Sequence, residues 1–99
     1  MIEYLYNCIR ATAGQNITVD AKITDDSGEA LTQSCGFMLH DKNDDKTMLA
    51  RVDGEYLSEE EMWRFTVPAE VTKGLKGRYW YCICHEDQNV CFKQPIYLV

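Results

Sequence analysis

The residues best suited to chemistry lie near the end of the chain, in Cys82-x-Cys84-His85 and Cys91. Structural zinc sites need four thiolate or imidazole ligands in a tetrahedron, and usually take them from C-x2-4-C turns. On a strand, residues two positions apart lie ~6.6 Å apart along one flat surface, and a neighbour such as His85 points to the opposite face. The sequence therefore predicts no metal site here, and free cysteines that pack as small hydrophobic side chains.

Residues 76–99 have the pattern of a β-hairpin, with two apolar runs around a polar tip at residues 86–89. A symmetric tip predicts the strand pairs Cys84–Cys91, Ile83–Phe92, Tyr81–Gln94 and Tyr79–Ile96. Because opposed strand residues bring their Cβ atoms to bridging distance, Cys84 and Cys91 could oxidise to a disulfide outside a cell. In cytosol we expect all five cysteines to stay reduced, with no cofactor bound.

Side chains alternate along each strand of this hairpin, and both of its faces are apolar. One face carries Tyr79, Tyr81, Ile83, Phe92 and Ile96, and the other carries Trp80, Cys82, Cys84, Cys91 and Pro95. We therefore expect the hairpin to lie inside a sheet that is covered on one face and partly covered on the other.

Two further clusters have some features of functional sites. Residues 41–46, DKNDDK, begin like a calcium-binding loop, but a lysine replaces its glycine and Val52 replaces its bidentate glutamate. Cys35 and His40 have the residue types of a nucleophile and its base, but no oxyanion-type glycine loop or orienting carboxylate accompanies them. We interpret residues 41–47 as a solvated hairpin loop and predict that the protein is not an enzyme.

The rest of the chain reads as short strands between turn signals. Residues 17, 19, 21 and 23 are apolar and alternate with polar residues, which is typical of a strand with one buried face. Further strands are predicted over residues 2–10, 35–40, 48–52 and 62–67. One helical turn is predicted over residues 68–75, ended by Gly74. Short strands at this spacing indicate one all-β domain over residues 1–99, a sandwich or a barrel, with Trp63 and Trp80 more typical of core than of a sugar-binding platform.

The composition excludes several function classes. The chain has 99 residues, 45% of them hydrophobic, which is enough for one packed domain. Its net charge of −6 argues against unaided binding of nucleic acid, which needs a basic footprint. No apolar run approaches the ~20 residues of a membrane helix. The first residues, MIEYLYNCIRATAGQ, lack the basic and continuous apolar regions of a signal peptide, so we expect none.

Residues 75–81, LKGRYWY, resemble the entry to strand F of immunoglobulin-like domains, where a tyrosine two residues before the core position forms the tyrosine corner. The resemblance implies structural roles for Gly77, Tyr79 and Tyr81, with the Tyr79 hydroxyl bonded to backbone within residues 71–77. Tyr81 stands where an antibody domain has cysteine, and strand C lacks the usual tryptophan. The resemblance therefore implies no disulfide between the sheets.

Residues 13–28 are similar to the opening of bacterial immunoglobulin-like repeats, which run A-G-Q, then alternating apolar residues, then T-D-x-x-G. The order of motifs along residues 13–98 is similar to small phage virion proteins with an immunoglobulin-like fold, including the N-terminal domains of baseplate upper proteins. The matching pieces are ITD at 23–25, FTVP at 65–68 and GRYWY at 77–81. The resemblance implies an immunoglobulin-like antiparallel β-sandwich of about seven strands.

From this resemblance we expect a non-enzymatic structural protein of a phage particle: a capsid decoration, a head fibre, or a tail or baseplate adaptor. Such a protein is assembled in the bacterial cytoplasm and acts through contacts with other virion proteins or with copies of itself in a symmetric assembly. Two other classes stay open. One is a host-surface or glycan-binding module, and the other is a small cytosolic metal or redox protein built on Cys82, Cys84 and Cys91.

Consecutive antiparallel strands place successive loops at opposite ends of a sandwich. Loops 25–34, 53–61 and 86–89 then share an acidic end, and loops 11–15, 41–47 and 68–77 share a mixed end. The acidic end holds ten of the sixteen acids: Asp25, Asp26, Glu29, Asp53, Glu55, Glu59, Glu60, Glu61, Glu86 and Asp87. We expect it to face solvent, a cation or a basic patch. The assembly contact is expected at Lys73 and Lys76 of the mixed end, or at the face of Trp80, Cys82 and Cys84.

Overall fold

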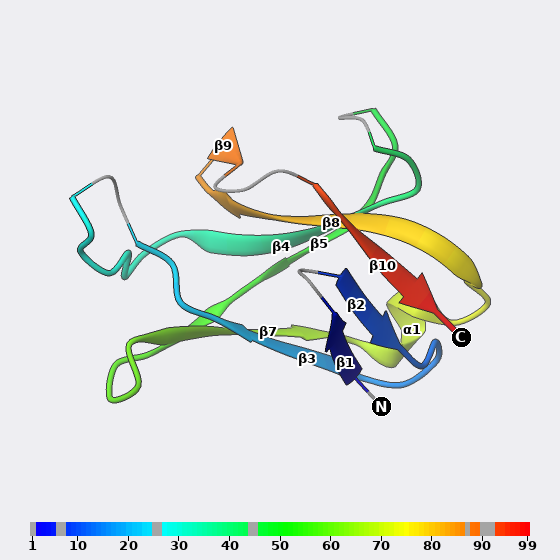
Figure 1. Ribbon diagram of the computed structural model, residues 1–99, viewed down its shortest axis with the longest axis horizontal. Coiled ribbons are helices and arrows are strands. Elements are labelled where there is room, and N and C mark those ends of the chain that lie inside the picture. Colours follow the sequence, from blue (N-terminus) through cyan, green and yellow to red (C-terminus); the bar gives the residue numbers. More distant parts are fainter. Residues whose placement is uncertain (1, 6–7, 25–26, 44–45, 87, 90–92) are drawn as a thin grey trace.

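The fold is built almost entirely from strands, which form two sheets packed face to face (Figure 1). The computed structural model describes residues 2–5, 8–24, 27–43, 46–86, 88–89 and 93–99. Each sheet has a face of apolar side chains, and these two faces are buried against each other. The prediction of an all-β chain with two sheets is therefore confirmed.

The larger sheet has the strand order β1-β2-β10-β8-β4-β5, and a short strand, β9, pairs with the end of β8. Its strands are β1 (Ile2–Leu5), β2 (Cys8–Ala11), β4 (Cys35–His40), β5 (Met48–Asp53), β8 (Gly77–His85), β9 (Gln88–Asn89) and β10 (Gln94–Leu98). Neighbouring strands are antiparallel, except that β2 and β10 are parallel. The long strand β8 thus lies between β10 and β4.

The smaller sheet has the order β3-β7-β6, with β3 (Ile17–Ala21), β6 (Glu55–Leu57) and β7 (Met62–Val67). The chain passes from the larger sheet to the smaller one at Gly54, between β5 and β6. The Gly54 amide donates a hydrogen bond to the Cys35 carbonyl oxygen at 2.9 Å. A Cβ atom on Gly54 would lie 2.5 Å from Cε1 of Phe65, so a side chain does not fit where the backbone crosses the aromatic core.

Aromatic rings form the centre of the core. Phe37 of β4 stacks on Tyr81 of β8 with ring centroids 5.3 Å apart, and it also contacts Phe65 of β7 at 6.2 Å. Trp63 stacks on Phe65 and donates its indole N–H to the Leu31 carbonyl oxygen at 2.7 Å. Trp63 is therefore a core residue with its polar atom satisfied, as the sequence predicts, and removing a ring such as Phe37 costs ~3–5 kcal/mol.

Residues 2–10 do not form the single strand that their composition predicts. They form β1 and the first part of β2, which pair with each other so that Ile2 lies opposite Ala11 and Leu5 opposite Cys8. The link at residues 6–7 lies outside the described residues. A run of aromatic and β-branched residues indicates strand but not where the chain folds back, and this is why the prediction was wrong. With β6 and β9 also unpredicted, the described residues form ten strands where about seven were expected.

The short helix α1 (Ala69–Thr72) follows Pro68 and leads to β8, and Gly74 after it has φ 85°. Its ends are fixed to the loop after β2, because Thr72 Oγ1 accepts from the Gly14 amide at 3.0 Å and Asn16 Oδ1 accepts from the Ala69 amide at 2.8 Å. Figure 1 shows α1 and the C-terminus at one end of the molecule, and the β6–β7 turn at the other.

Candidate functional site: the outer face of the larger sheet

The candidate site is the surface of the larger sheet that points away from the core, which we call the outer face. Tyr79, Tyr81 and Ile83 of β8 pack in or against the core. Because side chains alternate along a strand, Arg78, Trp80, Cys82 and Cys84 point outward. The same alternation in β4 directs Phe37 and Leu39 inward, and Gly36, Met38 and His40 outward. The two faces of β8 are thus separated as the sequence predicts.

Strand pairing arranges the outward residues in four rows across the sheet. The first row is Arg10, Tyr97 and Arg78; the second is Pro95, Trp80, His40 and Met48; the third is Cys82, Met38 and Arg51; the fourth is Cys84, Gly36 and Asp53. The outer face is therefore made mainly of arginine, aromatic and sulfur-containing side chains, with Asp53 in its fourth row.

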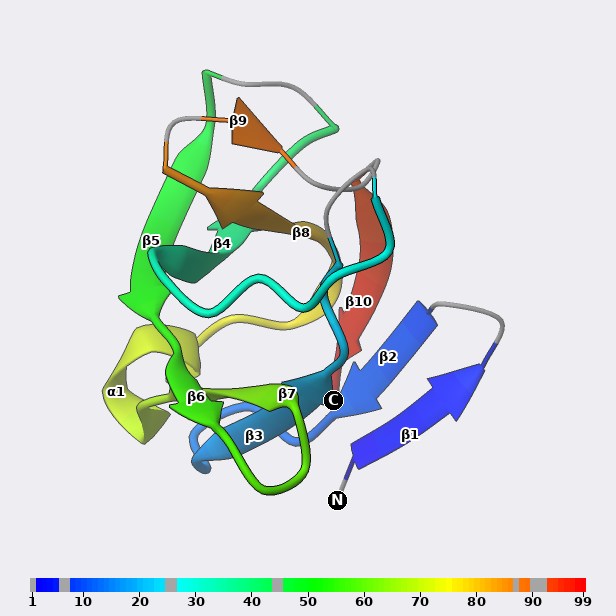
Figure 2. The same cartoon turned by 90° about the vertical axis from the view of Figure 1, so that its left-hand side faces the viewer.

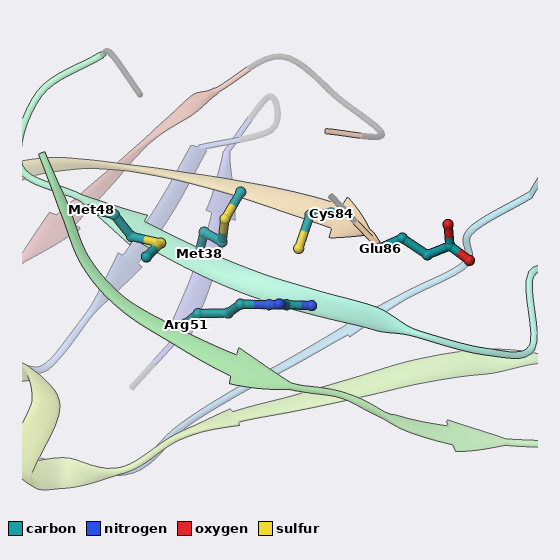
Figure 3. Close-up of a pocket in the computed structure, with 5 residues that line it drawn as sticks. All are labelled: Met38, Met48, Arg51, Cys84 and Glu86. Atoms are coloured by element: carbon teal, nitrogen blue, oxygen red, sulfur yellow. The ribbon is translucent and has the colours of Figure 1, made fainter. Parts of the chain in front are cut away.

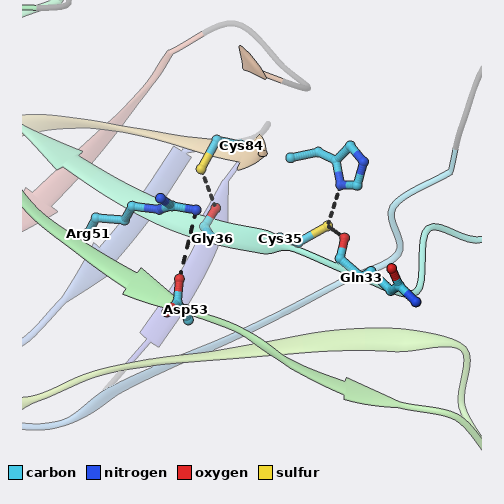
Figure 4. Close-up of polar contacts among 7 residues, drawn as sticks. Gln33, Cys35, Gly36, Arg51, Asp53 and Cys84 are labelled. Carbon is cyan, nitrogen blue, oxygen red and sulfur yellow. Dashed lines mark hydrogen bonds and ion pairs between the residues drawn. The ribbon is translucent and has the colours of Figure 1, made fainter. Parts of the chain in front are cut away.

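The thiols of Cys82 and Cys84 are buried although they lie on the outer face, with 0% and 2% of their surface exposed. Cys82 Sγ lies 3.8 Å from Nε2 of His40, a residue that is itself buried. Cys84 Sγ donates to the Gly36 carbonyl oxygen at 3.6 Å (Figure 4). These cysteines were predicted as contact residues, but only the side chains around them are exposed enough to meet a partner.

Cys84 is not opposite Cys91 in the way that a symmetric hairpin predicts. Its partner is Asn89, and His85 pairs with Gln88, so a two-residue turn follows His85 directly. Glu86 has φ 55°, as the first central position of a tight two-residue hairpin turn requires. The pairs Tyr81–Gln94 and Tyr79–Ile96 are confirmed. The return strand thus holds two extra residues between β9 and β10. Cys91 and Phe92 lie outside the described residues.

A pocket of about 190 Å³ opens on the outer face between β5, β4 and β8, lined by Met38, Met48, Arg51, Cys84 and Glu86 (Figure 3). Its floor is Gly36: a Cβ atom there would lie 2.8 Å from Arg51 Nε and 3.2 Å from Cys84 Sγ. The absence of a side chain thus lets the Arg51 guanidinium lie flat on the sheet beside the thiol. Arg51 also forms a long ion pair with Asp53, at 3.8 Å. The pocket offers a cation beside two methionine side chains.

The predicted pair of Cys35 with His40 is not formed. Cys35 points into the core, where its Sγ lies 3.9 Å from Nδ1 of His85, whereas His40 is on the outer face beside Cys82. Burial raises the pKa of the Cys35 thiol, with a smaller contribution from Cys84, so this thiol stays protonated at neutral pH. Cys35 therefore does not supply the activated thiolate that nucleophilic catalysis by this pair would need.

Trp80 is the half-buried centre of the outer face. The guanidinium carbon of Arg78 lies 5.4 Å from its ring centroid, which is a cation–π contact. Trp80 stands in the row between Pro95 and His40, and next to it Tyr97 and Met48 expose 40% and 51% of their surface. The arginine covers part of the ring, so Trp80 does not present the open aromatic surface of a sugar-binding platform.

The residues given structural roles occupy the inner side of β8. Tyr81 is buried and stacks on Phe37, and Gly77 has φ 108°, which favours glycine at the start of the strand. Tyr79 is half-buried against the core. Residues 71–77 are all described, and none of them forms a hydrogen bond with the Tyr79 hydroxyl, so the corner predicted for Tyr79 is not formed in that way.

The other predicted sites lie away from the outer face. Lys73 and Lys76 are exposed in the segment between α1 and β8. The loop that imitates a calcium site is a hairpin loop, closed by hydrogen bonds from the amides of Asp41 and Lys42 to Thr47, both 3.0 Å. Among the described residues, no three histidine, cysteine or acidic side chains gather closely enough to hold a metal ion.

Arg51, Met38 and Met48 were not identified from the sequence as site residues. The signal was the alternation of residues 35–40, where Gly36, Met38 and His40 occupy the positions opposite to Cys35, Phe37 and Leu39. Because both sets are largely apolar, the alternation of side chains along the strand did not show which set faces outward. The pairing of β4 with β5 and β8 was needed to bring Arg51 beside Cys84.

Similarity to known proteins does not assign a function to this site. Comparisons with protein-family models, curated proteins and solved structures each found no match to this chain. No helix within the described residues has the length and apolar character needed to cross a membrane.

Proposed function

We propose that this chain is an immunoglobulin-like sandwich with one strand, C′, beyond the constant-type set. The order β3-β7-β6 corresponds to strands B-E-D of such domains, and the order β10-β8-β4-β5 corresponds to G-F-C-C′. In this correspondence Tyr81 is on strand F at the core position. The proposal is supported by strand order in both sheets at once, which is more specific than the number of strands.

We infer that the protein works without catalysis, through a protein–protein contact made by the outer face. The observation that carries this function is the composition of that face. Trp, Tyr, Arg and Met are the residue types enriched at the centres of protein interfaces, and Trp80, Tyr97, Arg78 and Met48 occupy two adjacent rows. Exposed side chains surround a half-buried tryptophan there, which is the usual anatomy of a binding hot spot.

The place of that contact is a phage particle, where the chain acts as a capsid decoration, head fibre or tail adaptor. Support for this part of the proposal comes from the motifs shared with small virion proteins: ITD at 23–25, FTVP at 65–68 and GRYWY at 77–81. The last of these motifs supplies Arg78 and Trp80 of the outer face. The motif that resembles virion proteins and two of the proposed contact residues therefore lie on the same strand, β8.

The test is to look for the chain in particles encoded by the same genome. Particles are purified by density gradient, and the chain is quantified by mass spectrometry relative to the major capsid protein. The proposal predicts a fixed ratio that survives a second gradient, and a loss of the Trp80→Ala variant from the particles. Lys73→Ala, which changes an exposed residue off the outer face, is the matched control and stays incorporated. A chain that remains entirely with the unassembled protein would contradict the proposal.

The two alternative classes have less support. A glycan-binding module needs an open aromatic surface, and Arg78 covers part of the Trp80 ring. A metal or redox protein built on the hairpin needs converging sulfur atoms. Cys82 contacts His40, whereas Cys84 contacts the Gly36 carbonyl oxygen. One zinc per chain in purified protein, or binding of the monomer to glycans, would favour these classes instead.

A further inference from the structure

We propose that the partner of the outer face is a second copy of this chain, which docks the acidic turn between its β6 and β7 onto that face. The turn consists of Ser58, Glu59, Glu60 and Glu61, and all four residues are exposed. The contact is head to tail, so each copy offers one outer face and one acidic turn. This inference rests on the proposed function and specifies its partner.

The outer face carries three of the ten positively charged side chains of the chain, together with two exposed acids, Asp53 and Glu86. The chain has four arginines, and three of them, Arg10, Arg51 and Arg78, point outward from the larger sheet. The fourth, Arg64, lies on the smaller sheet and is held by Asp20. The net charge of the whole chain is −6. The row of Arg10, Tyr97 and Arg78, with two cations and an exposed tyrosine, fits an acidic partner.

The strongest acidic segment of the chain is the proposed occupant. Glu59, Glu60 and Glu61 are consecutive, and Glu61 has φ 53°, so the backbone turns sharply there. Figures 1 and 2 show this turn projecting beyond the end of the smaller sheet, away from the outer face of the same copy. A projecting turn can reach a neighbouring molecule, but the fold keeps it away from its own arginines.

Like charges argue against a symmetric pairing of two outer faces. Such a contact brings the same surface of both copies together, so that the rows with Arg10, Arg51 and Arg78 meet their equivalents. Two acidic turns would repel each other in the same way. Placing the turn on the face removes both repulsions, with carboxylates beside the Arg78 guanidinium. A contact between two different surfaces of one chain generates a ring or a filament.

Arg78 is the position that tests the contact best. It is exposed, it is fixed over Trp80, and its strand neighbour in the row is Tyr97. Arg10 has Glu3 as its strand partner, and Arg51 already pairs with Asp53. Reversing Arg78 therefore changes the face with the least effect on interactions within the chain.

The experiment uses two variants of the full chain. The face variant is Arg78→Glu, and the turn variant combines Glu59→Lys, Glu60→Lys and Glu61→Lys. Self-association is measured by sedimentation velocity over a wide range of protein concentration, at low and at high salt. Wild-type protein is expected to form species that grow with concentration and dissociate in high salt. Each variant alone is expected to associate with itself at least about tenfold more weakly than wild-type protein does. Lys73→Glu with Lys76→Glu is the control and associates like wild type.

Mixing the two variants provides the decisive result. The turn variant keeps an intact face and the face variant keeps an intact turn, and the two altered surfaces now carry opposite charges. An equimolar mixture is therefore expected to regain association that neither variant shows alone. Wild-type protein that stays monomeric at every concentration would overturn the inference, as would a mixture that associates no more than each variant alone. If Arg78→Glu is lost from particles while the turn variant is still incorporated, the face binds a different virion protein. The inference then fails although the proposed function stands. Near-UV circular dichroism checks that each variant is folded.

Discussion

Single residues on the outer face are held in place by contacts of different kinds. Arg78 is fixed by the Trp80 ring, a contact that contributes ~0.5–1 kcal/mol at an exposed site. Arg51 lies over Gly36, which has no side chain to displace it, and Cys84 donates to the Gly36 carbonyl oxygen. Two guanidinium groups are thus oriented before any partner arrives, which lowers the entropy lost on binding.

The reactivity of the cysteine thiols tests their structural role. Cys35, Cys82 and Cys84 are buried, and burial raises the pKa of the Cys35 thiol. We expect native protein to react with a thiol reagent far more slowly at these three positions than unfolded protein does, and unfolded protein to show all five thiols free. Mass spectrometry after labelling locates each modified cysteine. Fast native labelling of Cys35, or zinc in stoichiometric amount by elemental analysis, would refute the structural role of these thiols.

Tyr79 separates two accounts of the strand entry. A tyrosine-corner hydrogen bond would make Tyr79→Phe destabilising by ~1 kcal/mol. Without a bond from that hydroxyl to residues 71–77, we expect the substitution to change the free energy of unfolding by less than ~0.5 kcal/mol, as is usual for a change that loses no buried contact. Urea denaturation of both proteins measures the difference. Tyr81→Phe, at a core position two residues later, serves as a comparison.

The Asp20 carboxyl group is expected to make the stability of the protein depend on pH. Hydrogen bonds from Arg64, 2.9 and 3.1 Å long, hold the pKa of the Asp20 carboxyl below its ordinary value of 3.8. Because the folded pKa is depressed, the pair stabilises the protein above pH 3.8, and this contribution is lost as the pH falls through the lower pKa of the folded state. Thermal unfolding of wild type and Asp20→Asn should therefore converge at low pH. A gap of the same size at pH 7 and pH 2 would contradict this account.

At the scale of elements, strand alternation and turn residues were enough to locate most of the fold. The alternation in residues 17–21 and 62–67 predicts β3 and β7, and Pro68 with Gly74 predicts α1. The hairpin tip was wrong because a two-residue turn after His85 changes which residues face each other, and register in a hairpin depends on the turn. Sequence pattern alone does not reveal such a turn when, as here, no Asn-Gly or Asp-Gly marks it.

For a related reason, the sequence predicted only those residues of the candidate site that lie on β8. Trp80, Cys82 and Cys84 were identified because they alternate with tyrosines on one hairpin. Arg51 comes from β5, which does not pair with β8 and reaches the same pocket because β4 lies between them. Residues brought together by a third strand leave no local signal in the sequence.

Gly54 tests the connection between the sheets. A Cβ atom there would lie 2.5 Å from Phe65 Cε1 and 2.7 Å from Trp63 Cε3, and both rings are fixed in the core. We expect Gly54→Ala to destabilise the protein by ~1–3 kcal/mol, the usual cost of overpacking. Gly36→Ala is the matched control: its nearest neighbour is the Arg51 side chain, which can move toward solvent, so its cost is smaller. Chemical denaturation measures both, and equal effects would contradict the assigned role of Gly54.

At the scale of the whole molecule, charge and apolar surface are distributed unequally. The turn at residues 58–61 gathers glutamates at one end, whereas the outer face gathers Arg10, Arg51, Arg78 and the exposed side chains of Met48 and Tyr97. The mixed end near α1 carries Lys73 and Lys76. This distribution gives the molecule a polarity that a solubility role for the acids alone does not require. We therefore expect the outer face to make the assembly contact.

Hydroxyl-radical footprinting tests that assignment most directly. The free chain and the chain within purified particles are exposed to the same radical dose, and oxidation of each residue is read by mass spectrometry. Met48 and Tyr97, the most exposed oxidisable side chains of the outer face, should be modified in the free chain and protected in particles, together with Trp80. Tyr56, on the smaller sheet, serves as the reference and should keep its reactivity. Protection confined to the smaller sheet or to the segment around Lys73 and Lys76, with Met48 and Tyr97 still oxidised, would contradict the account.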